Sequence, residues 1–141
     1  MANFSDYIEQ QIFNHIFRDD TFAKPTTIAI ALTTGVLLDS QTGATIPEMP
    51  NSLGYARIAN ASGDSFWDAH GTDGPGDNAS LITFAQATGD WAAPVSGVAI
   101  IDNTTYGAGN VLMWGYLDTP RTVTNGDNFK FNAGNIDITI A

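Results

Sequence analysis

The residues from Val95 to Ile101 constrain the fold more than any other part of the sequence. They read Val-Ser-Gly-Val-Ala-Ile-Ile, follow Pro94 and are closed by Asp102 and Asn103. A short apolar run that is rich in β-branched residues and bounded by turn formers is typical of a strand buried on both faces, not of a helix. A chain with such a central strand must supply further sheet or helix to cover it.

A second apolar segment, residues 111–117, follows the central strand after a short turn that contains glycine. Because the connection is short, we expect the two segments to pair antiparallel. Strict alternation would divide the second segment between two faces. One face would carry Leu112, Trp114 and Tyr116, and the other would carry Val111, Met113 and Leu117.

A third strand is expected at residues 26–32. Ile28, Ile30 and Leu32 share one face of this strand, and Ala29 and Ala31 share the other. Small side chains on a face indicate that another element packs close to it. We expect the N-terminal helix to be that element.

Further short strands are expected between turns that are rich in Gly and Asn. They cover residues 54–59, 65–68, 79–85, 128–131 and 136–140, with alternate isoleucines of the last segment pointing inward. This makes about eight strands, without the alternation of strands and helices that a parallel sheet needs. The sequence therefore predicts a mainly β protein, an antiparallel β-sandwich of immunoglobulin-like or jelly-roll type, with one N-terminal amphipathic α-helix.

The helix is expected within residues 1–20, where Asn3 is a suitable N-cap and Asp6 complements the helix dipole. Apolar residues recur there at three- and four-residue spacing: Phe4, Tyr7, Ile8, Ile12, Phe13, Ile16 and Phe17. One face is expected to pack across the sheet or to close an end of the sandwich. Part of the helix, including Phe4, Tyr7 and Ile8, is also a candidate for contact with a neighbouring subunit. His15 beside this stripe is assigned no role.

Residues 1–141 are expected to form a single domain, with the helix in residues 1–20 and the sandwich in residues 21–141. Two long loops interrupt the sandwich, at residues 35–53 and 70–78. The first loop holds apolar residues that a freely solvated loop would not carry, and we expect them to dock on this chain or on a neighbour. These residues are Leu37, Leu38, Ile46 and Met49.

The second loop belongs to an Asp-rich region in which Asp64, Asp68, Asp73 and Asp77 raise the hypothesis of a calcium site. Their spacing fits no EF-hand, and Asp beside Gly and Pro is ordinary in a solvated turn, so no metal is assigned, and His70 is not assigned as a ligand. The sequence also lacks a phosphate-binding glycine loop, a paired-histidine zinc motif and a nucleophile elbow. We therefore predict no catalytic residues, no cofactor and no enzymatic activity.

The charge distribution excludes several classes of partner. Five Lys or Arg residues face fifteen Asp or Glu residues, which gives a net charge of −10. The five cations are scattered singly, whereas binding to nucleic acid needs clustered cations, so no direct nucleic-acid partner is expected. An acidic field also disfavours anionic membranes, and no apolar stretch approaches the roughly 18 residues that a membrane-spanning helix needs.

The order of several short segments resembles a family of small tailed-bacteriophage virion proteins. The segments are residues 1–7, 14–18, 25–27 and 31–32, Gly-Tyr-Ala-Arg at 54–57, residues 84–91 before 97–100, and the closing run through 119–123, 126–127, 129–131 and 133–134. Members of this family are commonly labelled tail-fibre or minor structural proteins, and they are similar to capsid cement or decoration proteins. No catalytic residues belong to the family pattern.

The resemblance implies a structural component of the virion. The preferred hypothesis is a homotrimeric cement protein on the outer capsid surface, which binds the major capsid protein and other copies of itself. The alternative is a tail or tail-fibre component whose partners are tail proteins. In that case Tyr55, Trp67 and Trp91 are candidates for an exposed aromatic platform that binds host glycans, and Trp67 is also a candidate subunit contact.

Overall fold

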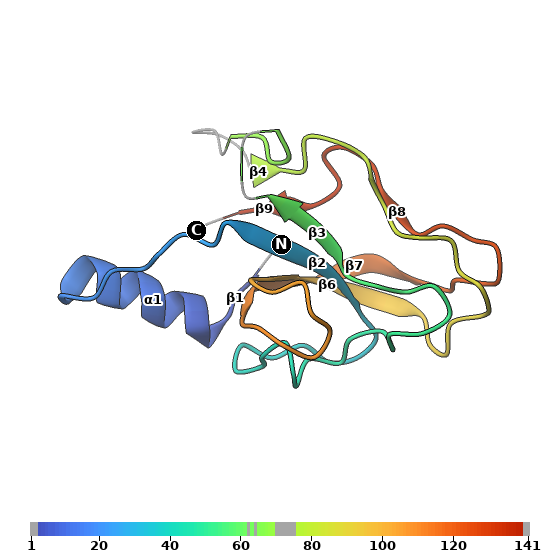
Figure 1. Ribbon diagram of the computed structural model, residues 1–141, viewed down its shortest axis with the longest axis horizontal. Helices are drawn as coiled ribbons and strands as arrows, with labels where there is room; N and C mark the ends of the chain where they lie inside the picture. The colour runs from blue at the N-terminus through green and yellow to red at the C-terminus, as the bar shows by residue number, and fades with distance from the viewer. Residues whose placement is uncertain (1–2, 62, 64, 70–75, 140–141) are drawn as a thin grey trace.

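Figure 1 shows a computed structural model of the chain, which describes residues 3–61, 63, 65–69 and 76–139. The described residues form nine strands and one helix, so the prediction of a mainly β protein with an N-terminal helix is confirmed. In chain order the elements are β1 (Asn3–Phe4), α1 (Asp6–Phe17), β2 (Thr27–Thr33), β3 (Ile58–Ala61), β4 (Gly76–Asp77), β5 (Ile82–Thr83), β6 (Val95–Ile101), β7 (Val111–Arg121), β8 (Lys130–Phe131) and β9 (Asp137–Ile138).

Strand β6 occupies the centre of a five-stranded antiparallel sheet with the order β1-β7-β6-β2-β3. Ala99 of β6 lies opposite Ala31 of β2 on one side and opposite Trp114 of β7 on the other. Most residues of β6 are buried. The two predictions made from residues 95–101, a central strand and an antiparallel partner in β7, are therefore confirmed.

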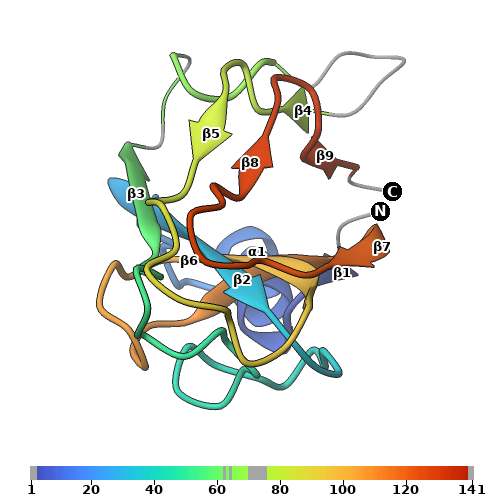
Figure 2. The same cartoon turned by 90° about the vertical axis from the view of Figure 1, so that its right-hand side faces the viewer.

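Two short ribbons, β5–β8 and β4–β9, lie over one face of this sheet and form a second layer (Figure 2). The main core lies between the two layers, where Ile30 and Leu32 of β2 meet Phe84, Phe129 and Phe131. The rings of Phe84 and Phe129 pack edge to face, with centroids 6.0 Å apart. Because each ribbon strand has only two residues, burial of these side chains holds the second layer on the sheet more than strand pairing does.

The small-residue face of β2 is covered by the segment that follows the strand, so the prediction that the N-terminal helix covers it is wrong. Ala31 packs with Leu37 and Ile46. The loop is held there because the Thr34 N–H donates to the Pro47 carbonyl at 2.9 Å and the Met49 N–H donates to the Leu32 carbonyl at 2.9 Å. The loop therefore folds back along its own strand and occupies the face that was expected to pack against the helix.

Strand β7 departs from strict alternation near its start. Ile100 lies opposite Met113 while Ile101 lies opposite Val111, which leaves Leu112 as an extra residue, a β-bulge. The bulge places Val111 in the same cluster as Trp114, and Leu112 packs beside Met113. The predicted division of residues 111–117 between the two faces is therefore wrong at these positions.

Strands β3 and β4 also differ from the sequence-based expectation. Strand β3 begins at Ile58 and not at Gly54, which lies in a turn where Leu53 and Gly54 have positive φ angles of 51° and 86°. Strand β4 lies inside the expected loop 70–78, where Asp77 pairs with Asp137. Residues 70–75 of that loop, and Ile140 of the expected last strand, lie outside the described residues.

Candidate assembly surfaces

The N-cap of helix α1 is Ser5, not the predicted Asn3, because Asn3 and Phe4 form β1 and pair with Trp114 and Met113. The hydroxyl of the fully buried Ser5 accepts a hydrogen bond from the Ile8 N–H at 3.3 Å and donates to the Val111 carbonyl. One side chain thus caps the helix and ties it to β7.

Only the first turn of α1 packs on the sheet. Ile8 is its single buried residue and lies in a cluster with Ile28, Ile100 and Leu112. Phe4 and Tyr7 are half-buried against the same cluster. These three predicted contact residues therefore face the chain's own core. The rest of the helix extends beyond the end of the sheet (Figure 1).

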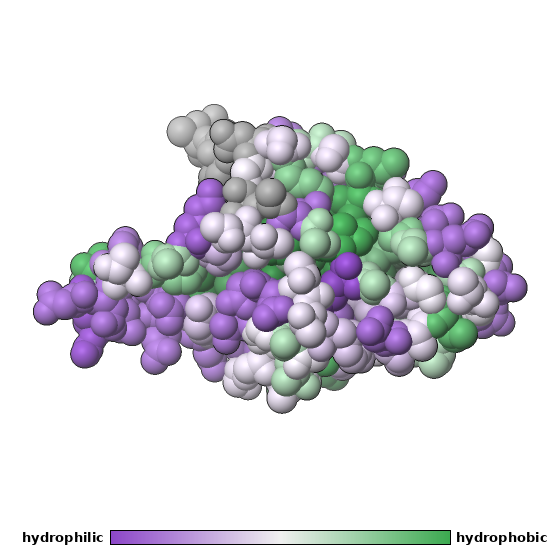
Figure 3. Space-filling model, in the orientation of Figure 1, coloured by the Kyte–Doolittle hydropathy of each residue, from purple (hydrophilic) through white to green (hydrophobic). Residues whose placement is uncertain are grey.

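The free end of α1 exposes a row of large apolar side chains, here called the α1 ridge. Ile12, Phe13, Ile16 and Phe17 are 37%, 57%, 62% and 71% exposed. The rings of Phe13 and Phe17 contact each other with centroids 5.1 Å apart. In Figure 3 much of the visible surface of α1 is hydrophilic, and hydrophobic atoms show along its upper edge. The expected packing of the helix on the sandwich is therefore found in its first turn, and the rest of its apolar stripe is exposed.

The chain returns toward the sheet alongside α1. The N–H of Phe22 donates to Nδ1 of His15 at 3.3 Å, and Phe22 is half-buried against the cluster around Ile8. His15, which the sequence left without a role, therefore holds this returning segment next to the helix. This segment does not cover the α1 ridge, because the four side chains of the ridge are exposed by the fractions given above with the segment in place.

The apolar residues of loop 35–53 divide into two groups. Leu37 and Ile46 are buried over Ala31, and Met49 is buried in the main core. Leu38 remains 55% exposed, as does its neighbour Val36 at 70%. Of the four contact candidates in this loop, the structure leaves only Leu38 accessible to another molecule.

A buried polar cluster around Arg57 anchors the same loop and was not found by sequence reasoning. The side chains of Arg57 and Glu48 are 0% and 3% exposed, and Arg57 Nη2 lies 2.7 Å from Glu48 Oε2. Arg57 also donates to the carbonyls of Asn103, Thr105 and Ala108 at 2.7–2.9 Å and to Gly43 at 3.1 Å.

The Tyr55 hydroxyl completes this cluster. It donates to Glu48 Oε1 at 2.8 Å and accepts from the Leu32 N–H at 3.0 Å, while burial and the nearby Glu48 carboxylate raise the pKa of Tyr55. The groups of the cluster are thus engaged with one another, which suits a structural anchor rather than a reaction. Its sequence signal is a charged residue within apolar neighbours, Ile-Pro-Glu-Met and Tyr-Ala-Arg-Ile.

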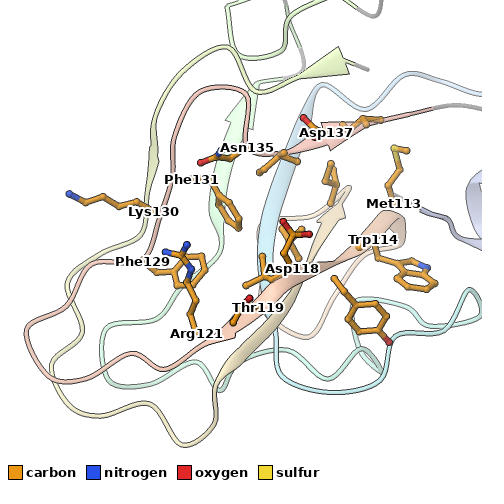
Figure 4. Close-up of a pocket in the computed structure, with 17 residues that line it drawn as sticks. Met113, Trp114, Asp118, Thr119, Arg121, Phe129, Lys130, Phe131, Asn135 and Asp137 are labelled. Atoms are coloured by element: carbon orange, nitrogen blue, oxygen red, sulfur yellow. The ribbon is translucent and has the colours of Figure 1, made fainter. Parts of the chain in front are cut away.

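A groove of about 470 Å³ opens between β7 and the second layer (Figure 4). Val98 and Ile100 line it from β6, and Phe129 and Phe131 line it from the β8 region. Asp118 projects from β7 into this space, and Arg121 stands beside Phe129, as Figure 4 shows. The groove thus combines an apolar interior with charged side chains along its margin.

The groove lies beside a free length of sheet edge. β7 spans Val111–Arg121, but β1 pairs only with Met113 and Trp114. Pro120 and the charged Asp118 and Arg121 lie in the part beyond β1, and such residues discourage an added strand. Side chains entering the groove therefore fit this surface better than an extra strand would.

The predicted aromatic platform is not formed. Tyr55 and Trp91 are buried in the main core, where Tyr55 stacks on Phe84 and the Trp91 indole N–H donates to the Leu53 carbonyl at 3.1 Å. Trp67 is half-buried against the core and contacts Phe66. The sequence misplaced these rings because an aromatic residue near turns looks the same whether it faces solvent or the core.

The calcium hypothesis gains no support from the described residues. Asp64, Asp73 and His70 lie outside them, and in the part of the chain that the structure describes no three His, Cys, Asp or Glu residues come together as metal ligands. Asp77 and Asp137 oppose each other as a pair. Among the same residues, the single helix is too short to cross a membrane.

Comparison with known proteins identifies the family of the chain. A family model described as podophage GP4 fiber I protein gp80 matches residues 3–139. No curated protein matches the sequence. The match extends over nearly the whole chain and confirms the resemblance to tailed-phage structural proteins of the virion. This chain belongs to the podophage GP4 fiber I protein gp80 family.

Proposed function

We propose that this chain is a non-enzymatic subunit of a phage tail fibre, present in several copies and built into the tail through the α1 ridge. The observation that carries the proposal is the exposure of Ile12, Phe13, Ile16 and Phe17 on a helix that extends beyond the sheet. Clustered apolar side chains of this size in water mark an interaction site, because covering them removes apolar surface from solvent.

The family description supports the tail over the capsid. It names a fiber protein, so tail proteins and further copies of this chain are the expected partners, and the capsid cement hypothesis with the major capsid protein as partner becomes the less favoured one. Repeated copies also compensate for a small contact area, since several weak contacts in one assembly act together. We keep the homotrimer as the preferred oligomeric state.

The absence of a catalytic role is supported by how the ionisable groups are used. The one ion pair found among the described residues, Glu48 with Arg57, has its donors directed at backbone carbonyls of the chain itself. In the part of the chain that the structure describes, the groove beside β7 is lined by charged groups but by no histidine, and His15 lies on α1.

Cryo-electron microscopy of intact virions at a resolution that traces this chain tests the proposal. We expect density for the chain in the tail fibres, with the α1 ridge covered by protein. Density repeated over the outer shell and bridging capsomers would overturn the tail assignment in favour of capsid cement. Density in the fibres with the α1 ridge open to solvent would overturn the role given to the ridge.

A further inference from the structure

We propose that the α1 ridge of one copy docks into the groove between β7 and the second layer of another copy. This inference rests on the proposed function, because it takes the α1 ridge to be an assembly surface and names the surface that covers it. Both surfaces belong to the same chain and lie on different elements, so each copy offers one ridge and one groove.

The dimensions of the two surfaces are compatible. The free end of α1 from Ile12 to Phe17 is about 7.5 Å long at 1.5 Å per residue. The groove follows β7 from Met113 to Arg121, which is about 26 Å at roughly 3.3 Å per residue. Its volume of about 470 Å³ falls in the range that accepts several side chains at once. Several side chains of the α1 ridge can therefore enter the groove together.

The use of the five cations points to a second copy as the occupant. Arg57 is buried with Glu48, Arg18 directly follows α1, and Lys24 lies in the segment between α1 and β2. The remaining two, Arg121 and Lys130, are both exposed and both line the groove. In Figure 4 Arg121 stands by the groove and Lys130 points outward from its margin. The same lining includes the carboxylates of Asp118 and Asp137, so the groove combines its two cations with two acidic groups in a chain of net charge −10.

The tip of α1 carries the complementary charge. Asp19 and Asp20 are exposed just beyond the C-terminal end of the helix, where the helix dipole is also negative. Two carboxylates at that end oppose the dipole, and a partner with two cations relieves the opposition. Arg121 and Lys130 supply these cations, and Arg18 of the tip can face Asp118 of the groove.

A ridge-to-groove contact is heterologous, because two different surfaces meet. Such contacts form a closed ring when the rotation between copies closes, and a filament when it does not. A ring of three would produce the homotrimer of the proposed function, with each groove occupied. An isologous contact of ridge on ridge would instead leave every groove empty.

Two variants separate these possibilities. The ridge variant Ile16→Asp/Phe17→Asp keeps the groove, and the groove variant Arg121→Glu/Lys130→Glu keeps the ridge. All four side chains are exposed, so circular dichroism and the unfolding midpoint should stay as in the original chain. Val36→Asp, at an equally exposed apolar residue outside the ridge, is the matched control.

Analytical ultracentrifugation of the purified proteins measures their association. We expect the original chain and the Val36→Asp control to form oligomers, and each of the two variants to raise the Kd of self-association by about tenfold or more. A mixture of the two variants should form a one-to-one dimer that does not grow, because one intact ridge and one intact groove remain. Restored association between Asp19→Lys/Asp20→Lys and Arg121→Glu/Lys130→Glu would support the charge pairing.

Other outcomes overturn the inference. If the groove variant associates as strongly as the original chain, the ridge contacts something other than the groove. If the original chain is monomeric at all concentrations, a second copy is not the occupant. The virion density is independent of this result: a monomer in solution that is present in the fibres refutes only the inference, and a ridge-to-groove oligomer absent from the tail refutes only the proposed function.

Discussion

The surroundings of Arg57 and the free end of α1 differ in which kind of side chain is buried and which is exposed. Arg57 and Glu48 are charged, yet they are buried and hydrogen bonded by the chain itself. Ile16 and Phe17 are apolar, yet most of their surface faces solvent. Charged residues are usually exposed and large apolar residues are usually buried, so both places are exceptions. Only the buried charges have partners within the chain, which compensate for the loss of solvent.

This difference separates stability from assembly. A buried ion pair with its hydrogen bonds made is explained by the fold, because it joins loop 35–53 to the segment between β6 and β7. An exposed apolar ridge gains nothing for the isolated chain, because its side chains stay in water. We therefore expect substitutions around Arg57 to change folding, and substitutions on the α1 ridge to change association.

The largest effect is expected for Arg57→Ala. The substitution removes the ion-pair partner of the buried Glu48, which then keeps only the Tyr55 hydroxyl as a donor, and it removes the donor of four backbone carbonyls. This should lower the free energy of unfolding by about 5 kcal/mol. Urea denaturation measures it. The exposed Arg121→Ala should change it by no more than about 0.5 kcal/mol. Similar losses for the two variants would contradict the anchoring role.

The second prediction compares two phenylalanines directly. Phe84 is fully buried in the main core, so Phe84→Ala should cost about 4 kcal/mol from lost burial and the cavity left behind. Phe17→Ala should change the stability of the monomer by less than about 0.5 kcal/mol, because the ring is 71% exposed. Thermal unfolding at a concentration that keeps the chain monomeric tests both. A large loss for Phe17→Ala would mean that the α1 ridge packs on its own chain.

Ser5 ties α1 to β7, and its removal should have a moderate effect. Ser5→Ala deletes the helix cap and the hydrogen bond to the Val111 carbonyl, which should cost about 1–2 kcal/mol. Hydrogen exchange should show faster opening of α1 than of β6. Ser5→Thr, which keeps the hydroxyl, is the control. Equal loss of protection in both elements would mean that α1 unfolds only with the sheet.

The smallest effect concerns Asp77 and pH. Burial, the facing Asp137 and the nearby Asp68 raise the pKa of the Asp77 carboxyl above 3.8. Folding therefore favours the protonated carboxyl: the stabilisation is fully present at pH values below about 4 and is lost as the pH rises through the folded pKa. Hydrogen exchange of the β4–β9 ribbon should thus slow in acid, after correction for intrinsic rates.

Asp127 provides the internal comparison for this pH dependence. The Thr124 N–H and hydroxyl donate to its carboxylate at 2.9 and 2.8 Å and lower the pKa of Asp127. The stabilisation of the fold by the ionised Asp127 is present at pH values above the pKa of the unfolded chain and is lost as the pH falls through the folded pKa. NMR titration of the two carboxyl groups should therefore give a raised pKa for Asp77 and a lowered pKa for Asp127. Asp77→Asn should abolish the acid-dependent change in the ribbon.

Residue patterns alone predicted much of the architecture. The apolar run at β6, its short connection to β7 and the turn-rich spacing were sufficient for a central strand, an antiparallel pair and a mainly β chain with one helix. These features depend on local chemistry, since side chains alternate along a strand and recur every three to four residues along a helix. The order of short segments also pointed to the phage structural family.

Tertiary structure decided which apolar residues are covered. Phe84 and Phe17 have the same side chain, but one meets a second layer built from residues far along the chain and the other meets solvent. It also decided that Arg57 finds Glu48, that a bulge at Leu112 shifts β7, and that Tyr55 and Trp91 point inward. Each depends on contacts between segments distant in sequence, which no local pattern encodes.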